Sequence, residues 1–202
     1  MDWCGKLDPD AAANLSLFQT IPEADWSAVD ERVWNNAGAV VDLGCHPWDW
    51  SAAFIGRKRV VGADPFADPV PGAELFRGII GPACGSAVIS QCDGFSSVFT
   101  NDSAKGQVEK TVQMLSWPRF RQRFNLDQIA VLKINIEGSE WPLLASMGAD
   151  DFDGIDQIAV SFHDFLWPTR TKATDAALAY LKSVGYTIAP INKEWRWYLC
   201  LR

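Results

Sequence analysis

Short apolar segments that alternate with helix-like segments constrain the fold of this 202-residue chain more than any other feature. The four clearest cover residues 39–43, 59–64, 129–136 and 157–162. Their length and aliphatic content are typical of strands buried on both faces of a parallel sheet. Two later β-rich runs, residues 186–191 and 194–202, are joined by a short Asn-Lys turn that suits an antiparallel hairpin. We therefore expect an α/β fold with a doubly wound, mostly parallel sheet and an antiparallel C-terminal hairpin.

In most of the segments between these strands, apolar residues recur at the spacing of a helix. The predicted helices cover residues 22–38, 46–56 (after a turn), 137–148 and 173–184. The first belongs to an N-terminal helical segment, residues 1–38, that we expect to pack on a single domain spanning residues 1–202. Residues 65–100 are rich in Gly, Pro and Ser, and only weak strands at 74–78 and 87–92 are predicted there.

Composition excludes several classes of function. A net charge of −7 argues against nucleic acid as a partner, because such binding needs many Lys and Arg side chains to neutralise phosphates. No apolar run approaches the ~20 residues that cross a bilayer, and the acidic N-terminus does not resemble a secretory signal, so we expect a cytoplasmic protein without membrane contact. The five cysteines form no CxxC pair, which argues against a zinc or redox motif.

Asp42, Gly44 and Asp64 carry the first signal of a binding site. Asp42 and Gly44 lie where a buried strand must turn, and Asp64 ends the next strand at close to the ~20-residue spacing at which an acidic side chain binds ribose hydroxyls. The turn lacks GxGxxG, which favours a nucleoside without a pyrophosphate. The alternative is that each Asp only caps a turn.

A second group of polar residues follows two later strands. Lys133, Asn135 and Glu137 alternate with apolar residues and are expected on one face of a central strand, where burial is costly unless they bind each other or a ligand. His163 and Asp164 follow the strand at 157–162, and histidine is the side chain best suited to accept a proton near neutral pH. A divalent metal held by Glu137, Glu140, His163 and Asp164 is a weaker alternative, and we expect none.

Several motifs of the chain resemble the FkbM family of S-adenosylmethionine-dependent methyltransferases. They are VVDLG, GADPFADP, GFSSVF, VLKINIEGSEWPLL and IAVSFHDF, spread from about Val40 to Asp164. The resemblance implies a seven-stranded Rossmann-like methyltransferase sheet with S-adenosylmethionine as cofactor. It further implies that Asp42, Gly44 and the backbone of Cys45 and His46 contact the methionine part of the cofactor. The segment containing Asp64, Pro65 and Phe66 would bind the ribose.

The same resemblance gives the expected reaction. Members of the family typically methylate hydroxyl groups of sugars, glycolipids or natural products, so we expect an O-methyltransferase that acts on a small or carbohydrate acceptor, with His163, Glu137 and Lys133 as catalytic residues. The chain departs from the family at Asn135, where the family has Asp, and around Pro47–Asp49, where the family has a later loop glycine. A domain that binds the cofactor or a partner without catalysis is therefore an alternative. The pattern DLGxxPxxWS also resembles the FtsJ-type ribose methyltransferases of RNA, which the acidic charge disfavours.

Overall fold

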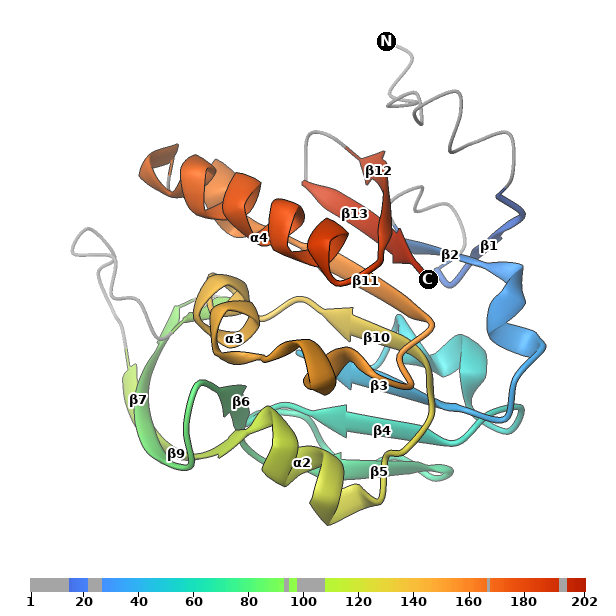
Figure 1. Ribbon diagram of the computed structural model, residues 1–202. Helices are drawn as coiled ribbons and strands as arrows, with labels where there is room; N and C mark the ends of the chain where they lie inside the picture. Colours follow the sequence, from blue (N-terminus) through green and yellow to red (C-terminus); the bar gives the residue numbers. More distant parts are fainter. Residues whose placement is uncertain (1–14, 22–26, 93–94, 98–107, 167, 193–195) are drawn as a thin grey trace, which may run out of the picture.

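A seven-stranded sheet forms the centre of the molecule (Figure 1). The computed structural model describes residues 15–21, 27–92, 95–97, 108–166, 168–192 and 196–202. From one edge to the other the strands are β12 (Thr187–Asn192), β13 (Trp197–Leu201), β11 (Gln157–Ser161), β10 (Ile129–Ile134), β3 (Ala39–Leu43), β4 (Val60–Ala63) and β5 (Ala73–Phe76). Neighbours from β11 to β5 run parallel, whereas β13 is antiparallel to both β11 and β12. The predicted parallel sheet and C-terminal hairpin are confirmed.

The central strand β10 ends earlier than the sequence predicts. It stops at Ile134, so Lys133 lies in the strand while Asn135 and Glu137 lie in the loop that follows. The expectation that all three polar side chains share one strand face is therefore wrong. The cause is a left-handed turn, in which Glu137 and Gly138 have φ values of 52° and 95°.

Three α-helices cover one face of this sheet. They are α2 (Trp117–Phe124), α3 (Glu140–Ser146) and α4 (Thr171–Ser183), and Figure 1 shows them in front of the strands. Trp117, Leu144 and Leu181 extend from these helices into one apolar core with Leu132 and Val160 of the sheet. Among the described residues, no helix combines the length and apolar character that crossing a bilayer requires.

The opposite face is covered without an α-helix in the described part of the chain. The short strands β1 (Leu17–Gln19) and β2 (Ala28–Asp30) pair there, followed by the 3₁₀ turn η2 (Glu31–Trp34). The predicted helix over residues 22–38 is wrong for residues 28–34; residues 22–26 and the predicted leader 1–14 lie outside the described residues. Strand pairing prevails because the backbone of Asp30 exchanges hydrogen bonds of 3.0 Å with the Gln157 side chain of β11.

The helix predicted over residues 46–56 is also wrong, because only the 3₁₀ turn η3 (Ser51–Phe54) forms there. Trp48 has a φ of 78°, which a helix does not allow, and its indole packs on β4 at Gly62. The indole Nε1 donates a 2.8 Å hydrogen bond to the Asp68 carbonyl. Aromatic side chains thus cover the face where a second layer of helices was expected, and the doubly wound arrangement is not confirmed.

A second, four-stranded sheet is formed by strands that lie between β5 and α2 in the sequence. In spatial order its strands are β6 (Ile79–Gly81), β9 (Val108–Ser116), β7 (Gly85–Cys92) and β8 (Phe95–Ser97). The weak strands predicted at 74–78 and 87–92 overlap β5 and β7, whereas β6, β8 and β9 were not predicted. This sheet projects beside the main one (Figure 1).

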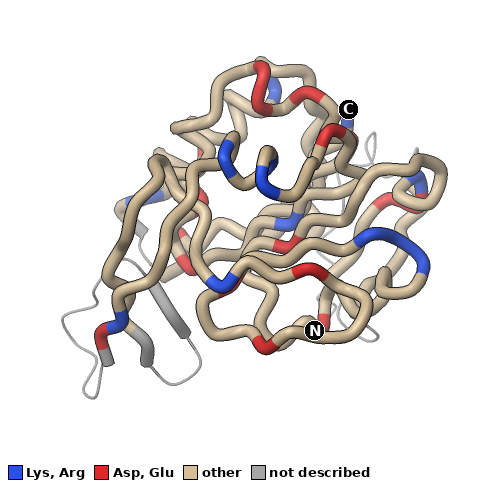
Figure 2. Tube along the Cα trace, turned by 90° about the horizontal axis from the view of Figure 1, so that it is seen from below, with Lys and Arg blue, Asp and Glu red and all other residues tan. Residues whose placement is uncertain are grey.

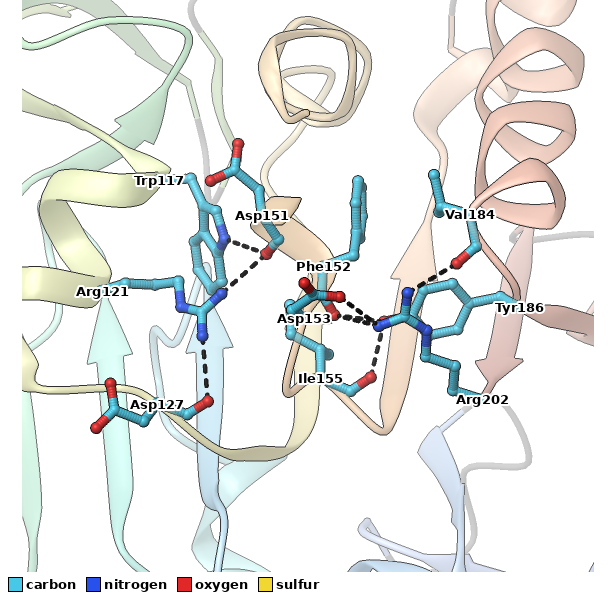
Figure 3. A network of polar contacts seen from close by, with 10 residues as sticks. All are labelled: Trp117, Arg121, Asp127, Asp151, Phe152, Asp153, Ile155, Val184, Tyr186 and Arg202. Carbon is cyan, nitrogen blue, oxygen red and sulfur yellow. Dashed lines mark hydrogen bonds and ion pairs between the residues drawn. The ribbon is translucent and has the colours of Figure 1, made fainter. Parts of the chain in front are cut away.

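Arginine side chains close the edge of the main sheet at which β10 and β11 begin (Figure 3). Arg121 donates to the carbonyls of Leu126, Asp127 and Asp151 over 2.9–3.2 Å. Arg202 donates to the carbonyls of Phe152 and Val184 over 2.9 and 3.0 Å. Two long side chains thus join these loops by donating to their backbone carbonyls.

Candidate active site

A cleft lies beyond the carboxyl ends of β3, β4 and β10, the edge at which α/β sheets bind ligands. It encloses about 770 Å³ of empty space, counting the part open to solvent. The main sheet and its loops contribute Leu43, Gly44, His46, Ala63, Asp64, Pro65, Phe66, Asn135, Ile136, Glu137 and Ser139. The region around the second sheet contributes Gly78, Ile79, Ile80 and Ile89.

Beneath the cleft, Asp42 and Lys133 form a buried ion pair. They are register partners on β3 and β10, so both side chains lie on the same face of the sheet, and the Lys133 Nζ is 2.7 Å from the Asp42 Oδ1. Ser51 donates to the other carboxylate oxygen over 2.7 Å. Burial raises the pKa of the Asp42 carboxyl, and the ammonium of Lys133 offsets this only in part. Neither side chain lines the cleft.

Gly44 is required by the packing of two loops against each other. It has a φ of 82°, and a Cβ at this position would fall on the carbonyl oxygen of Asn135. Lys133 Nζ donates a 2.7 Å hydrogen bond to the Gly44 carbonyl, and the Asn135 N–H donates to the Leu43 carbonyl over 3.1 Å. Gly44 lines the cleft, but the space that its missing side chain leaves is occupied by the backbone of Asn135 and not by a ligand.

Asp64 lines the cleft and also caps the turn that follows β4. Its Oδ1 accepts hydrogen bonds from the N–H groups of Phe66 and Ala67 over 2.7 and 3.0 Å. Its Oδ2 accepts only a longer one, 3.3 Å, from the His46 N–H. The turn-cap alternative is therefore confirmed for Oδ1, while Oδ2 keeps capacity for a further donor.

Cys45 and His46 occupy different environments although they are adjacent. The Cys45 side chain is buried in the core on the face opposite the helices, away from the lining of the cleft, and burial raises the pKa of its thiol. His46 lines the cleft. Of the two, only His46 lies where the resemblance places a cofactor contact.

A cluster of ionisable side chains lies at the N-terminal end of α3 and consists of Glu137, Glu140 and His163. His163 Nδ1 is 2.8 Å from Glu140 Oε1, and His163 Nε2 is 3.3 Å from Glu137 Oε2. Burial lowers the pKa of His163, but hydrogen bonds to the two carboxylates and their charges outweigh burial and raise it to about 10. The ring is therefore an imidazolium at neutral pH. Only Glu137 of the three lines the cleft.

Asp164 belongs to a separate pair. Its two carboxylate oxygens accept hydrogen bonds of 2.9 and 2.7 Å from the guanidinium of Arg196, which holds the pKa of Asp164 below its usual range against the effect of burial. The possible fourth metal ligand is thus engaged elsewhere. Within the described ranges, no group of three or more His, Cys, Asp or Glu side chains is arranged to hold a metal ion.

The cleft brings together about half of the site residues that the sequence predicts. Those that line it are Gly44, His46, Asp64, Pro65, Phe66 and Glu137. Those that do not are Asp42, Cys45, Lys133 and His163. Lys133 in particular is committed to Asp42 and Gly44, and its predicted catalytic role gains no support from this position. Sequence reasoning missed the isoleucines of the second sheet, because residues 65–100 carried no strong strand signal.

Comparison with known proteins agrees with the motifs. The model of the methyltransferase FkbM domain matches residues 58–188, more than half of the chain, starting after Asp42 and Gly44. A crystal structure of methyltransferase FkbM from Methylobacillus flagellatus KT is similar at 15% identity and a TM-score of 0.47, covering 82% of this chain and 44% of that one. The chain thus spans less than half of that protein. No curated protein matches. On the family match, this chain belongs to the FkbM methyltransferase family.

Proposed function

We propose that the protein transfers a methyl group from S-adenosylmethionine to a hydroxyl group of a sugar or another small acceptor. One observation carries the proposal: a single cleft is bordered both by Asp64, the candidate ribose ligand, and by Glu137, a carboxylate able to take a proton. The two lie on loops after β4 and β10, so cofactor and acceptor would meet at one edge of the sheet.

The residues present fit a nucleoside cofactor. Asp64 Oδ2 accepts only one long hydrogen bond from the protein, which leaves lone pairs for a ribose hydroxyl. Phe66, Ile79 and Ile80 supply apolar surface beside it. S-adenosylmethionine would bring a methyl group already activated by its sulfonium, so the task of the protein is to align the acceptor and remove its proton.

Glu137 is the better candidate for proton removal. His163 was the base expected from the sequence, but an imidazolium with both N–H groups directed at carboxylates has no lone pair to accept a proton. Glu137 lines the cleft and touches His163 on its other side. In this proposal Glu137 takes the hydroxyl proton, and His163 orients Glu137 and balances its charge.

Two observations favour a second candidate, a domain that binds the cofactor without catalysis. Asn135, in the position where the family has Asp, lines the cleft. Trp48 lies in the segment where the family has a later loop glycine, and it takes a left-handed conformation with its ring packed against β4. An RNA substrate has less support, because Lys and Arg are interspersed with Asp and Glu along the described trace (Figure 2).

Calorimetry with S-adenosylhomocysteine tests cofactor binding. We expect micromolar-scale affinity and a loss of about 1.5–3 kcal/mol in Asp64→Asn, because a charge-assisted hydrogen bond to the ribose is lost. The amide oxygen of Asn can still cap the Phe66 and Ala67 N–H groups, so thermal stability should change little. Asp68→Asn is the matched control, since the Asp68 side chain is 91% exposed on the same loop. Absence of binding by the wild type would refute the proposal.

Methyl transfer from labelled S-adenosylmethionine to pooled sugars and hydroxylated small molecules separates the two candidates. Transfer to a hydroxyl, reduced about 10²-fold or more in Glu137→Gln, is the expected result for an enzyme that uses Glu137 as its base. Cofactor binding with no transfer across the pools would favour the non-catalytic domain.

A further inference from the structure

Glu140 is a charged side chain with no exposure to solvent at the first position of α3. A buried carboxylate is costly unless hydrogen bonds and opposite charge compensate for its lost hydration. Glu140 has both: Oε1 accepts from the Ile136 N–H over 2.9 Å and contacts His163 Nδ1 at 2.8 Å, and Oε2 accepts from the Gly138 N–H over 3.0 Å. One carboxylate thus connects the loop after β10, the helix α3 and the 3₁₀ turn that follows β11.

The loop that Glu140 ties is in an unfavourable conformation. Glu137 has a φ of 52°, in the left-handed region that costs a non-glycine residue about 1 kcal/mol or more. The two N–H groups that Glu140 accepts belong to the residues on either side of Glu137. These bonds hold the turn that places the Glu137 side chain at the cleft.

The same carboxylate fixes the His163 ring. With Nδ1 directed at Glu140, the Nε2 of the ring is left facing Glu137 Oε2 at 3.3 Å. The charged groups that act on the ring are Glu137, from the loop after β10, and Glu140, from α3; the neighbouring Asp164 is paired with Arg196. A positively charged His163 ring between two carboxylates has a proton on each nitrogen. It therefore offers no lone pair to a molecule in the cleft.

We propose that Glu140 is the positioning residue of the site, and that it aims the Glu137 carboxylate into the cleft by holding both the turn through Glu137 and the His163 ring that contacts Glu137. Glu140 itself does not line the cleft, so it acts through Glu137. The inference rests on the proposed function for its meaning in catalysis, but the geometry can be tested without an acceptor.

The chain contains only two histidines, His46 and His163, so nuclear magnetic resonance of the imidazole nitrogens can follow each, with His46→Gln as the assignment. In the wild type, both nitrogens of His163 should carry protons at about pH 7, in line with its raised pKa. Glu140→Gln retains one acceptor oxygen and cannot hold all three donors. The His163 midpoint should then fall by at least about one pH unit, because a charge-assisted bond to the ring is lost.

Ser146→Ala, at the far end of α3, is the control for destabilisation of the helix, since the Ser146 hydroxyl donates only to the Leu143 carbonyl. It should leave the His163 titration unchanged. An unchanged midpoint in Glu140→Gln would overturn the proposal, and so would a neutral His163 ring in the wild type at about pH 7, a result that holds even if the variant fails to fold.

Binding of S-adenosylhomocysteine separates this inference from the proposed function. Glu140→Gln should bind it within about twofold of the wild type, because Glu140 does not touch the cleft, while methyl transfer to any acceptor found should fall about 10²-fold in kcat with KM for the cofactor kept. Loss of cofactor binding in Glu140→Gln alone would overturn the positioning role. No binding by the wild type would refute the proposed function and leave the His163 result standing.

Discussion

The two ends of the central strands, their amino ends and their carboxyl ends, are stabilised by different kinds of polar contact. Each of these ends forms one edge of the main sheet. At the edge where β10 and β11 begin, Arg121 and Arg202 donate mainly to neutral backbone carbonyls, and the Arg202 side chain stays 34% exposed (Figure 3). At the edge where the strands end, Lys133 and His163 are paired with carboxylates and are each only 5% exposed. The first edge joins loops without full desolvation of charge, whereas the second buries several charges together.

The difference shows which edge is built for stability. Arginines that reach carbonyls while still touching water stabilise a fold at low cost, because their charge remains partly hydrated. Buried ion pairs often contribute no net stability compared with apolar residues of the same size. We infer that the charges at the carboxyl edge are kept because they hold the loops of the cleft in place.

The largest effect should come from breaking the buried pair below the cleft. Lys133→Met leaves the Asp42 carboxylate buried without its cation and should lower the free energy of unfolding by about 3–5 kcal/mol. Urea denaturation measures this loss. The double variant Lys133→Met with Asp42→Asn, which removes both charges, should recover a large part of it. If Lys133→Met were as stable as the wild type, the buried charges at the carboxyl ends of the strands would not depend on each other, and the difference drawn between the two edges would be wrong.

A smaller effect is expected at the opposite edge. Arg121→Met removes three hydrogen bonds to carbonyls and should cost about 1–3 kcal/mol in urea denaturation. Its affinity for S-adenosylhomocysteine should equal that of the wild type, because Arg121 is remote from the lining of the cleft. Weakened binding in Arg121→Met would mean that the two edges are not independent.

The pH dependence of stability isolates His163. Its pKa is raised to about 10 in the folded protein, above the unfolded value of about 6.5, so its contribution is complete below about pH 6.5 and is lost as the pH rises through about 10. Between these limits the unfolding free energy should fall by up to about 1.4 kcal/mol per pH unit more in the wild type than in His163→Asn. Parallel curves for the two proteins, measured by urea denaturation, would exclude a raised pKa.

Salt should have the smallest effect. The proposed binding of S-adenosylhomocysteine relies on short hydrogen bonds and apolar contact, so the affinity should change less than about twofold between about 0.05 M and 0.5 M salt. An RNA oligonucleotide, by contrast, would bind with a steep salt dependence if the alternative substrate class were correct. Calorimetry at both salt concentrations, with each ligand, makes the comparison.

The central strands were predictable because runs such as those at 39–43 and 157–162 are short and apolar, contain β-branched residues and alternate along the chain with helix-like segments. The elements that cover the face opposite the helices were not predictable. Val29 and Val33 have helical spacing, but they pack against the sheet from β2 and a 3₁₀ turn. Short apolar segments are ambiguous between these structures until a partner strand is known.

The site was predicted in outline and not in detail. Asp64 and Glu137 lie at the cleft as their positions at strand ends indicated. His163 contacts Glu137 and Glu140, while Asp164, its neighbour in the sequence, binds Arg196. The role of Glu140 could not be predicted, because nothing in a glutamate signals the left-handed turn at position 137 on which it depends.

The contact between Gly44 and the Asn135 carbonyl has a mechanical consequence. Because no side chain fits between them and Lys133 Nζ donates a hydrogen bond to the Gly44 carbonyl, the loops after β3 and β10 pack backbone against backbone, and a shift of either loop is resisted by the other. The loop after β4 is joined to the loop after β3 through the bond from the His46 N–H to Asp64. Direct contacts therefore connect the loop that carries Asp64, through the loop after β3, to the loop that carries Glu137.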